Sequence, residues 1–188
     1  MGQYYVPIIR RGPGKFDTFD SHDYNNGLKL MEHSYIGNTF VDTICKQLYN
    51  RPGRLAWVGD YAENDDYFGG RDLAMFIQEA WNDAKELKNR KKPAETDGNF
   101  LNDKFVVNLS KNEYVDMAKY IAITKVDNYD LQVHPLPLLT AVGNGRGGGD
   151  YSGSSMDYVG SWAGDTIIVT DSKPASGEDI SDVSFEER

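Results

Sequence analysis

The sequence predicts an α+β fold, with a single domain that has an antiparallel-rich sheet, two or three helices and a long glycine-rich loop. About five to seven short segments are rich in β-branched and aromatic residues, which is typical of strands. The few segments with helical spacing do not alternate with these strands as a doubly wound fold requires. The 188 residues, 39% of them hydrophobic, suit one core within residues 1–172, and we expect an acidic, flexible tail at residues 173–188.

A β-hairpin is predicted to open the domain. Residues 3–10 (QYYVPIIR) are β-branched and aromatic, and the turn signal Gly12-Pro13-Gly14 separates them from a second strand at residues 15–19. Because proline lacks a backbone N–H, Pro7 predicts that the first strand lies at a sheet edge or carries a bulge.

Two stretches show helical periodicity. The first extends from Leu28 to Tyr49 and forms one helix or two, because Gly37-Asn38 is expected to break or bend it. The second begins near Asp72 and is the clearest helix in the chain. Its apolar stripe is predicted to face the core and consists of Leu73, Phe76, Ile77, Ala80, Trp81, Ala84 and Leu87.

A second hairpin is predicted in the later part of the chain. Residues 105–109 and 113–120 flank the turn residues Ser110-Lys111-Asn112, and Ile121 and Ile123 are expected to extend the second strand. Further extended segments are predicted at residues 54–61, 134–140 and 165–170.

The charge balance indicates the class of partner. The chain has 29 acidic and 20 basic residues, a formal net charge of −9, whereas a dedicated nucleic-acid binder needs clustered Lys and Arg. We therefore expect a partner with a basic surface. The one cysteine, Cys45, excludes an intrachain disulfide and a multi-cysteine zinc site. Because no signal peptide and no run of about 18 apolar residues is found, we expect a cytoplasmic location.

The glycine-rich segment at residues 141–155 contains GxGxxG at Gly143, Gly145 and Gly148. A dinucleotide site needs this motif between a strand and a helix, and no amphipathic helix follows it here. The chain also lacks the Gly-Lys-Ser or Gly-Lys-Thr of a P-loop. We expect no bound cofactor, and we interpret the segment as a surface loop in which Arg146 and Tyr151 order against a partner.

Two other functional interpretations remain open. Glu32, His33 and Ser34 combine a base with a nucleophile, so one alternative is a small hydrolase or nucleotide-processing enzyme that uses this region, Asp60 and the glycine-rich loop. Against it, adjacent side chains on a helix point in different directions, and a helical histidine is more often hydrogen-bonded into the core. The second alternative is a nucleic-acid-binding accessory protein that uses the basic patch from Lys85 to Lys92.

An acidic loop follows the strand predicted at residues 54–61. Its carboxylates suit a hard cation, but the spacing and the closing Glu of an EF-hand are absent, so we assign no metal. The carboxylates either imitate nucleic-acid phosphates toward the Arg and Lys of a partner or belong to a solvated loop. The candidate partner-binding residues are Asp60, Glu63, Asp65, Asp66 and Tyr67, together with Arg146 and Tyr151.

Four segments carry a resemblance to a known class of protein: MGQYYVPIIRR, LMEHSYIGNTFVDTI, RLAWVGDYA and HPLPLLTAVGNGRGGGDY. They resemble small proteins carried on mobile elements of gut anaerobic bacteria, among them a type II anti-CRISPR inhibitor. The resemblance implies a phage- or plasmid-borne inhibitor without enzymatic activity. Such an inhibitor binds the RNA-guided nuclease, or its complex with guide RNA, and blocks DNA binding or cleavage. The resemblance assigns no role to individual residues.

Overall fold

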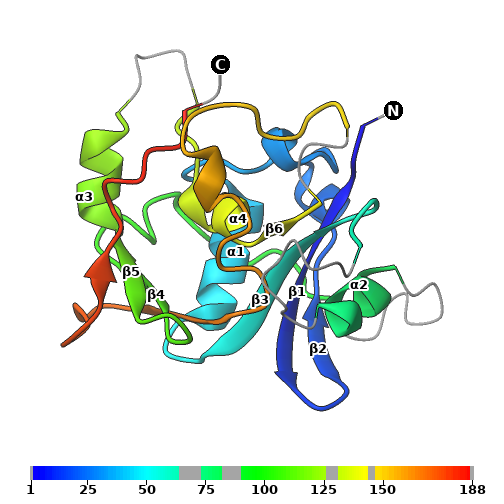
Figure 1. Ribbon diagram of the computed structural model, residues 1–188, viewed down its shortest axis with the longest axis horizontal. Helices are drawn as coiled ribbons and strands as arrows, with labels where there is room; N and C mark the ends of the chain where they lie inside the picture. Colours follow the sequence, from blue (N-terminus) through cyan, green and yellow to red (C-terminus); the bar gives the residue numbers. More distant parts are fainter. Residues whose placement is uncertain (1, 64–72, 82–89, 126–130, 144–146, 187–188) are drawn as a thin grey trace.

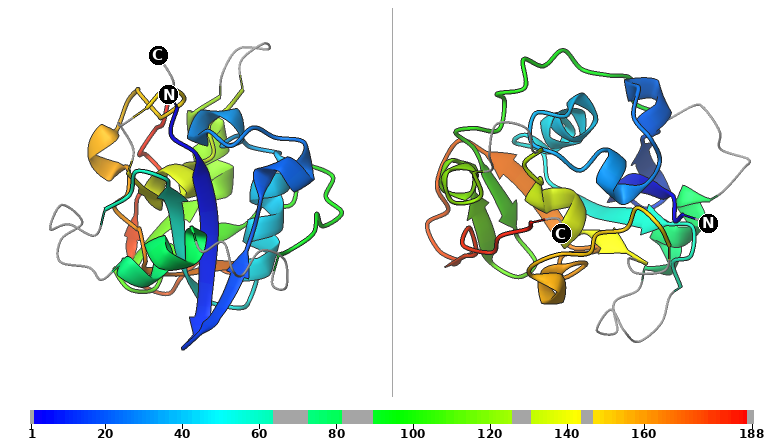
Figure 2. Two further views of the ribbon diagram at one scale, coloured as in Figure 1. Left: turned by 90° about the vertical axis from the view of Figure 1, so that its right-hand side faces the viewer. Right: turned by 90° about the horizontal axis from the view of Figure 1, so that it is seen from above.

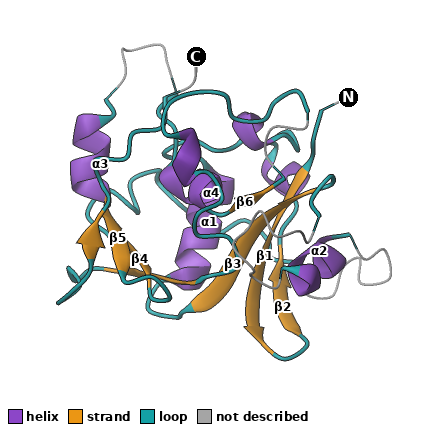
Figure 3. Ribbon diagram, in the orientation of Figure 1, coloured by secondary structure: helices purple, strands orange, loops and turns teal. Residues whose placement is uncertain are grey.

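The computed structural model describes residues 2–63, 73–81, 90–125, 131–143 and 147–186 (Figure 1). The strands within these residues are β1 (Tyr5–Gly12), β2 (Lys15–Thr18), β3 (Gly53–Gly59), β4 (Phe105–Asn108), β5 (Glu113–Asp116), β6 (Ala141–Val142), β7 (Thr166–Thr170) and β8 (Glu178–Asp179). The α-helices are α1 (Thr39–Leu48), α2 (Ala74–Ala80), α3 (Met117–Ile123) and α4 (Pro135–Leu139) (Figure 3). This mixture confirms the predicted α+β class.

The eight strands form one sheet in the order β2-β1-β3-β7-β4-β5-β8, and β6 pairs with β3. The β3–β6 and β5–β8 pairs are parallel, and the other pairs are antiparallel, as predicted. The two predicted hairpins are present as β1–β2 and β4–β5. β1 lies between β2 and β3 rather than at an edge, and its register shifts between Arg10 and Gly12. Pro7 is tolerated because β2 pairs with β1 only from Ile8 onward.

β3 lies inside the sheet, where it pairs with β1, β6 and β7, and its alternating side chains enter two separate cores. Leu55 and Trp57 belong to the larger core, which contains the buried face of α1. Ala56 and Val58 belong to a smaller core on the other face, where they meet α2. Figure 2 shows α1 and α2 on opposite sides of the strands β1 and β3. Because both faces are covered, the strand is apolar almost throughout rather than alternating with polar residues.

α1 begins where the sequence predicted a break. The Asn38 side chain accepts a hydrogen bond from the Phe40 N–H at 2.9 Å, which is the contact of a helix N-cap. Before the cap, residues 30–32 form the short 3-10 helix η2 (Leu30–Glu32). The Leu28–Tyr49 stretch therefore contains two helical pieces, the second of which buries Phe40, Ile44 and Leu48.

α2 is present, but one residue of its predicted core stripe is not in the core. Leu73 and Phe76 are fully buried, and Ile77 and Ala80 pack partly against the smaller core. Trp81 is 40% exposed, because the helix ends at Ala80 and the tryptophan lies past its last turn. The prediction that Trp81 faces the core is therefore wrong. Asp72, Ala84 and Leu87 lie outside the described residues.

Two segments that were predicted as extended, residues 117–123 and residues 135–139, are helices in the structure. After β5 the chain forms α3, whose N-terminus is capped by Asp116, the acceptor for the Lys119 N–H at 3.2 Å. Met117 and Tyr120, three residues apart, are buried, whereas Ile123 is exposed. Residues 135–139 form α4, which starts at Pro135 because the missing N–H of proline costs nothing in the first turn. The apolar residues of both segments also fit the pattern of a strand. For this reason the Asp116 cap and the helix start at Pro135 were not recognised in the sequence.

The segment expected to be a flexible tail is largely packed on the domain. β8 pairs with β5, and the Ile180 N–H donates to the Tyr114 carbonyl at 2.9 Å. Ile180 and Phe185 are buried in the larger core, where the Phe185 ring meets the Tyr151 ring edge-on at 5.8 Å between centroids. These two apolar residues anchor an otherwise polar segment, so residues 178–186 belong to the fold.

Replacing Phe185 with alanine is expected to release this segment locally rather than to unfold the domain. The cost should be about 2 kcal/mol, below that of a central core residue, because detachment of the terminal segment limits it. Hydrogen exchange at the Ile180 amide measures the opening, and Glu178→Gln, at an exposed position of the same segment, is the control. Unchanged exchange in Phe185→Ala would show that the ring does not hold the segment.

None of the helices in the described residues has the length and apolarity needed to span a bilayer.

Candidate docking surface

The end of β3 holds Asp60 in a defined position at the surface. The Tyr4 N–H donates to Asp60 Oδ1 at 3.1 Å, and the Asp60 N–H donates to the Tyr4 carbonyl at 2.9 Å. These two hydrogen bonds continue the β1–β3 pairing by one residue beyond Tyr5 and Gly59. The exposed carboxylate is thus fixed to two strands rather than carried on a free loop.

Three exposed aromatic residues lie near the end of β3 that carries Asp60: Tyr4 is bonded to Asp60 through its backbone, Tyr61 follows Asp60 in the chain and Trp81 is bonded to Gly59. Tyr4 is 44% exposed, Tyr61 is 36% exposed and Trp81 is 40% exposed. The Trp81 indole N–H donates to the Gly59 carbonyl at 3.2 Å, which holds the ring beside the strand end. Exposed Trp and Tyr side chains are enriched among the residues that carry binding energy at protein interfaces. We call Tyr4, Asp60, Tyr61, Glu63 and Trp81 the Asp60 surface.

The Asp60 surface rests on buried polar residues. Gln3 and Tyr5 are fully buried, and the Tyr5 hydroxyl donates to Gln3 Oε1 at 2.8 Å. The Gln3 amide fits against Gly59 and Gly143, where a Cβ atom on either glycine would collide with it. Burial raises the pKa of Tyr5 far above its ordinary value, and the negative charges of Asp150 and Asp60 raise it further. Because Gln3 and Tyr5 are uncharged and closely packed, the Asp60 surface is preorganised for binding a partner.

The predicted partner-binding residues divide into three groups. Asp60 and Glu63 are exposed at the Asp60 surface. Tyr151 is buried and its hydroxyl donates to the Ser154 carbonyl at 2.7 Å, so its assignment to a partner contact is corrected to a core role. The remaining predicted residues, Asp65, Asp66, Tyr67 and Arg146, lie outside the described residues.

Tyr4 and Trp81 were missed by the sequence analysis. Tyr4 lies in a segment predicted as a strand, in which successive side chains point to opposite faces. Because Tyr5 is buried, this alternation could have predicted that Tyr4 points outward. Trp81 fits the apolar spacing of α2 and was therefore assigned to the core.

The glycine-rich segment is attached to the N-terminal part of the chain through its described residues. Gly148 forms a bridge with Gly2, and the Met31 N–H donates to the Gly149 carbonyl at 3.0 Å. Its first residues form β6 beside β3. Gly143, at the start of the segment, packs against Gln3 and against the backbone of Ala62, which follows β3.

His33, the proposed catalytic base of the enzyme alternative, is a buried structural residue. The Trp57 indole N–H donates to His33 Nε2 at 3.0 Å, so the ring proton lies on Nδ1, which donates to the Gly27 carbonyl at 3.0 Å. Burial lowers the pKa of His33 to about 4, so the ring is neutral at pH 7. Both ring nitrogens are occupied.

The neighbours of His33 do not complete a catalytic arrangement either. The Ser34 hydroxyl donates to the Leu30 carbonyl at 2.6 Å, and Glu32 Oε2 accepts the Lys29 N–H at 3.0 Å. His134 is fully buried, accepts the Leu136 N–H on Nδ1 at 3.1 Å, and has its pKa lowered to about 3 by burial. These groups stabilise local structure and do not reach a solvent-accessible site together.

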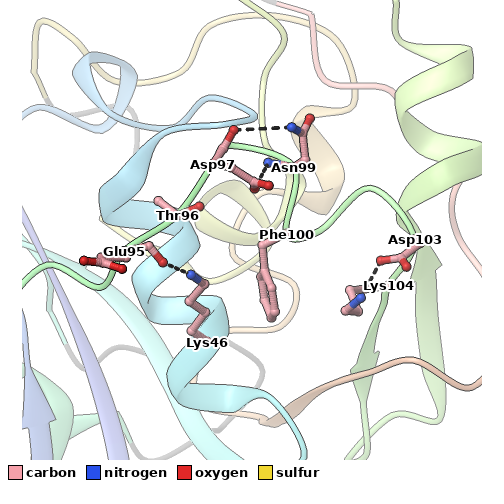
Figure 4. Close-up of a pocket in the computed structure, with 8 residues that line it drawn as sticks. All are labelled: Lys46, Glu95, Thr96, Asp97, Asn99, Phe100, Asp103 and Lys104. Carbon is pink, nitrogen blue, oxygen red and sulfur yellow. Dashed lines mark hydrogen bonds and ion pairs between the residues drawn. The ribbon is translucent and has the colours of Figure 1, made fainter.

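A pocket of about 670 Å³ lies between α1 and the loop that follows residue 94 (Figure 4). Phe100 stands between Lys46 and Lys104, whose Nζ atoms lie 5.4 and 5.5 Å from the ring centroid. Lys46 donates to the Glu95 carbonyl, and Lys104 pairs with Asp103 and with Asp171. Lys104 is thus ion-paired within the chain, the Lys46 ammonium donates to a neutral backbone carbonyl, and no predicted site residue lines the pocket.

The basic patch of the nucleic-acid alternative is partly neutralised. Arg90 pairs with Asp20 and Asp23, each at 2.6 Å, and Lys91 pairs with Asp17 at 3.2 Å. Lys85 and Lys88 lie outside the described residues. Ion pairs to three carboxylates reduce the positive field available to a phosphate backbone.

Within the described part of the chain, no group of three or more His, Cys, Asp or Glu side chains is arranged to hold a metal ion. No protein-family description, curated protein or solved structure matches this chain.

Proposed function

We propose that this protein binds and inhibits the RNA-guided DNA nuclease of type II CRISPR systems, and that it docks through the Asp60 surface. The observation that carries the proposal is that three exposed aromatic residues, Tyr4, Tyr61 and Trp81, lie at the end of β3 where hydrogen bonds hold Asp60 and Trp81 in place. Aromatic rings supply binding area, and the carboxylates supply charge for a basic partner.

The choice of partner rests on the resemblance and on charge. RNA-guided nucleases hold the guide–target heteroduplex in a positively charged channel, and an acidic protein of net charge −9 is complementary to such a surface. Occupation of the channel blocks DNA binding, and occupation of a surface needed for the later conformational change blocks cleavage. The action requires no catalytic group in the inhibitor.

The proposal is tested by Trp81→Ala in binding and DNA-cleavage assays with the guide-loaded nuclease and with the nuclease alone. We expect binding to weaken by roughly tenfold or more, because truncating a central aromatic residue of an interface costs about 2 kcal/mol. Tyr158→Ala, which removes an equally exposed ring from the 3-10 helix η5 (Met156–Tyr158), should leave binding unchanged.

Two results would contradict the proposal. If the parent protein neither binds nor inhibits the nuclease, the function is wrong. If Trp81→Ala and Tyr158→Ala bind as tightly as the parent protein, the nuclease is recognised by another surface.

A further inference from the structure

The Asp60 surface combines flat aromatic rings with exposed carboxylates. A cation placed over the face of Trp or Tyr is attracted by the ring, and a carboxylate beside the ring adds a charge-assisted hydrogen bond. Asp60 uses Oδ1 to accept the Tyr4 N–H at 3.1 Å, and a carboxylate has further acceptor positions. The surface therefore offers both contacts to one positively charged group.

Charge selects among the possible occupants. A nucleic acid would bring phosphates toward Asp60 and Glu63, both of which are exposed. A second copy of this chain, packed on the same surface about a twofold axis, would bring the two carboxylates of each copy into one interface. Both occupants would therefore bring negative charge close to Asp60 and Glu63. A basic segment of another protein brings positive charge and avoids this repulsion.

The shape of the contact favours arginine over lysine. The guanidinium group is planar, stacks on aromatic faces, is weakly hydrated and presents several donors in one plane to a carboxylate. An ammonium group has one strongly hydrated charge and no flat face. A hydrogen bond to the Gly59 carbonyl holds the Trp81 ring, and a hydrogen bond from the Tyr4 N–H holds the Asp60 carboxylate. Because both side chains are already ordered, they lose little conformational entropy when a ligand binds.

We infer that the Asp60 surface is an arginine-binding site, which stacks the guanidinium of a basic partner segment on its aromatic rings and pairs it with Asp60. The inference rests on the proposed function for its biological setting, because the nuclease would supply the arginine. The contact itself is a property of this chain and is tested without the nuclease.

The experiment is an NMR titration of the ¹⁵N-labelled protein. The chain has three tryptophans, and Trp57 and Trp162 are fully buried, so their indole signals report the folded state while the Trp81 signal reports the surface. Acetyl-Arg-Arg-amide is compared with acetyl-Lys-Lys-amide at the same ionic strength, and Trp81→Phe assigns the signal. We expect the Trp81 indole signal to shift, with a Kd for the arginine peptide roughly three- to tenfold lower than for the lysine peptide.

Asp60→Asn tests the carboxylate, because asparagine keeps an oxygen to accept the Tyr4 N–H. We expect a weaker Kd for the arginine peptide by roughly three- to tenfold. Asp157→Asn, which removes an exposed carboxylate from η5, should leave this Kd unchanged. Equal Kd values for the two peptides, an absent Trp81 shift, or an unchanged Kd in Asp60→Asn would overturn the inference.

The outcome separates this inference from the proposed function. If the protein binds the arginine peptide but does not inhibit the nuclease, the arginine site is supported and the proposed partner is wrong. If it inhibits the nuclease but does not prefer the arginine peptide, the proposed partner is supported and the arginine site is wrong.

Discussion

Phe76→Ala is expected to lower the free energy of unfolding by roughly 3–5 kcal/mol, the usual cost of removing a buried phenyl ring. The ring is fully buried in the smaller core, whose members include Ile8, Ala56 and Val58. The guanidinium of Arg54 lies 5.2 Å from the ring centroid, so the substitution also removes a cation–π contact. In a domain of this size the melting temperature should fall on the order of 10 °C.

Thermal and urea unfolding followed by circular dichroism measures this effect. Gln78→Ala is the control, because Gln78 is exposed on the same helix and its replacement should change stability little. A Phe76→Ala protein that unfolds at the parent midpoint would mean that α2 is not packed on β1 and β3.

Stability is expected to fall by about 4 kcal/mol between pH 7 and pH 5 because two histidines are buried in their neutral form. Burial lowers the pKa of His33 to about 4 and that of His134 to about 3, whereas both titrate near 6.5 in the unfolded chain. Their contribution is fully present above pH 6.5. As the pH falls below 6.5 the unfolded state takes up protons that the folded state does not, so unfolding becomes easier, until the folded pKa values are reached.

Urea unfolding at pH 7, 6 and 5 measures this dependence. His134→Asn should reduce the slope to about half, because asparagine retains an acceptor for the Leu136 N–H while removing one titrating group. If stability does not change between pH 7 and pH 5, the two rings are not held neutral.

The candidate site could be predicted only in part. The sequence pointed to Asp60 and Glu63, because carboxylates after a buried strand stand out from the surrounding apolar residues. It could not bring Tyr4 and Trp81 to the same place, since Tyr4 comes before β1 and Trp81 follows α2, and their contacts to Asp60 and Gly59 cross long stretches of chain. It also placed Tyr151 at the surface, although the ring packs against Phe185, far along the chain.

The sequence by itself determined the elements whose causes are local. The turn at Gly12-Pro13-Gly14 and the turn after β4 specify the two hairpins, because short loops fix which strands pair. The stripe at Leu73 and Phe76 specifies α2, and the apolar run of β3 specifies a buried strand. Asn38 caps α1 where the helical pattern was interrupted.

Only the tertiary structure decided the elements whose local signals conflict. The segments of α3 and α4 are apolar enough to fit a strand, and burial of Tyr120, Leu136 and Leu139 in the larger core selects the helical form. Likewise, a polar chain end becomes part of the fold through the burial of Ile180 and Phe185. The spacing of apolar residues limits a segment to a helix or a strand. Where both fit, the free energy that decides between them comes from packing against residues distant in the sequence, which come into contact only in the folded chain.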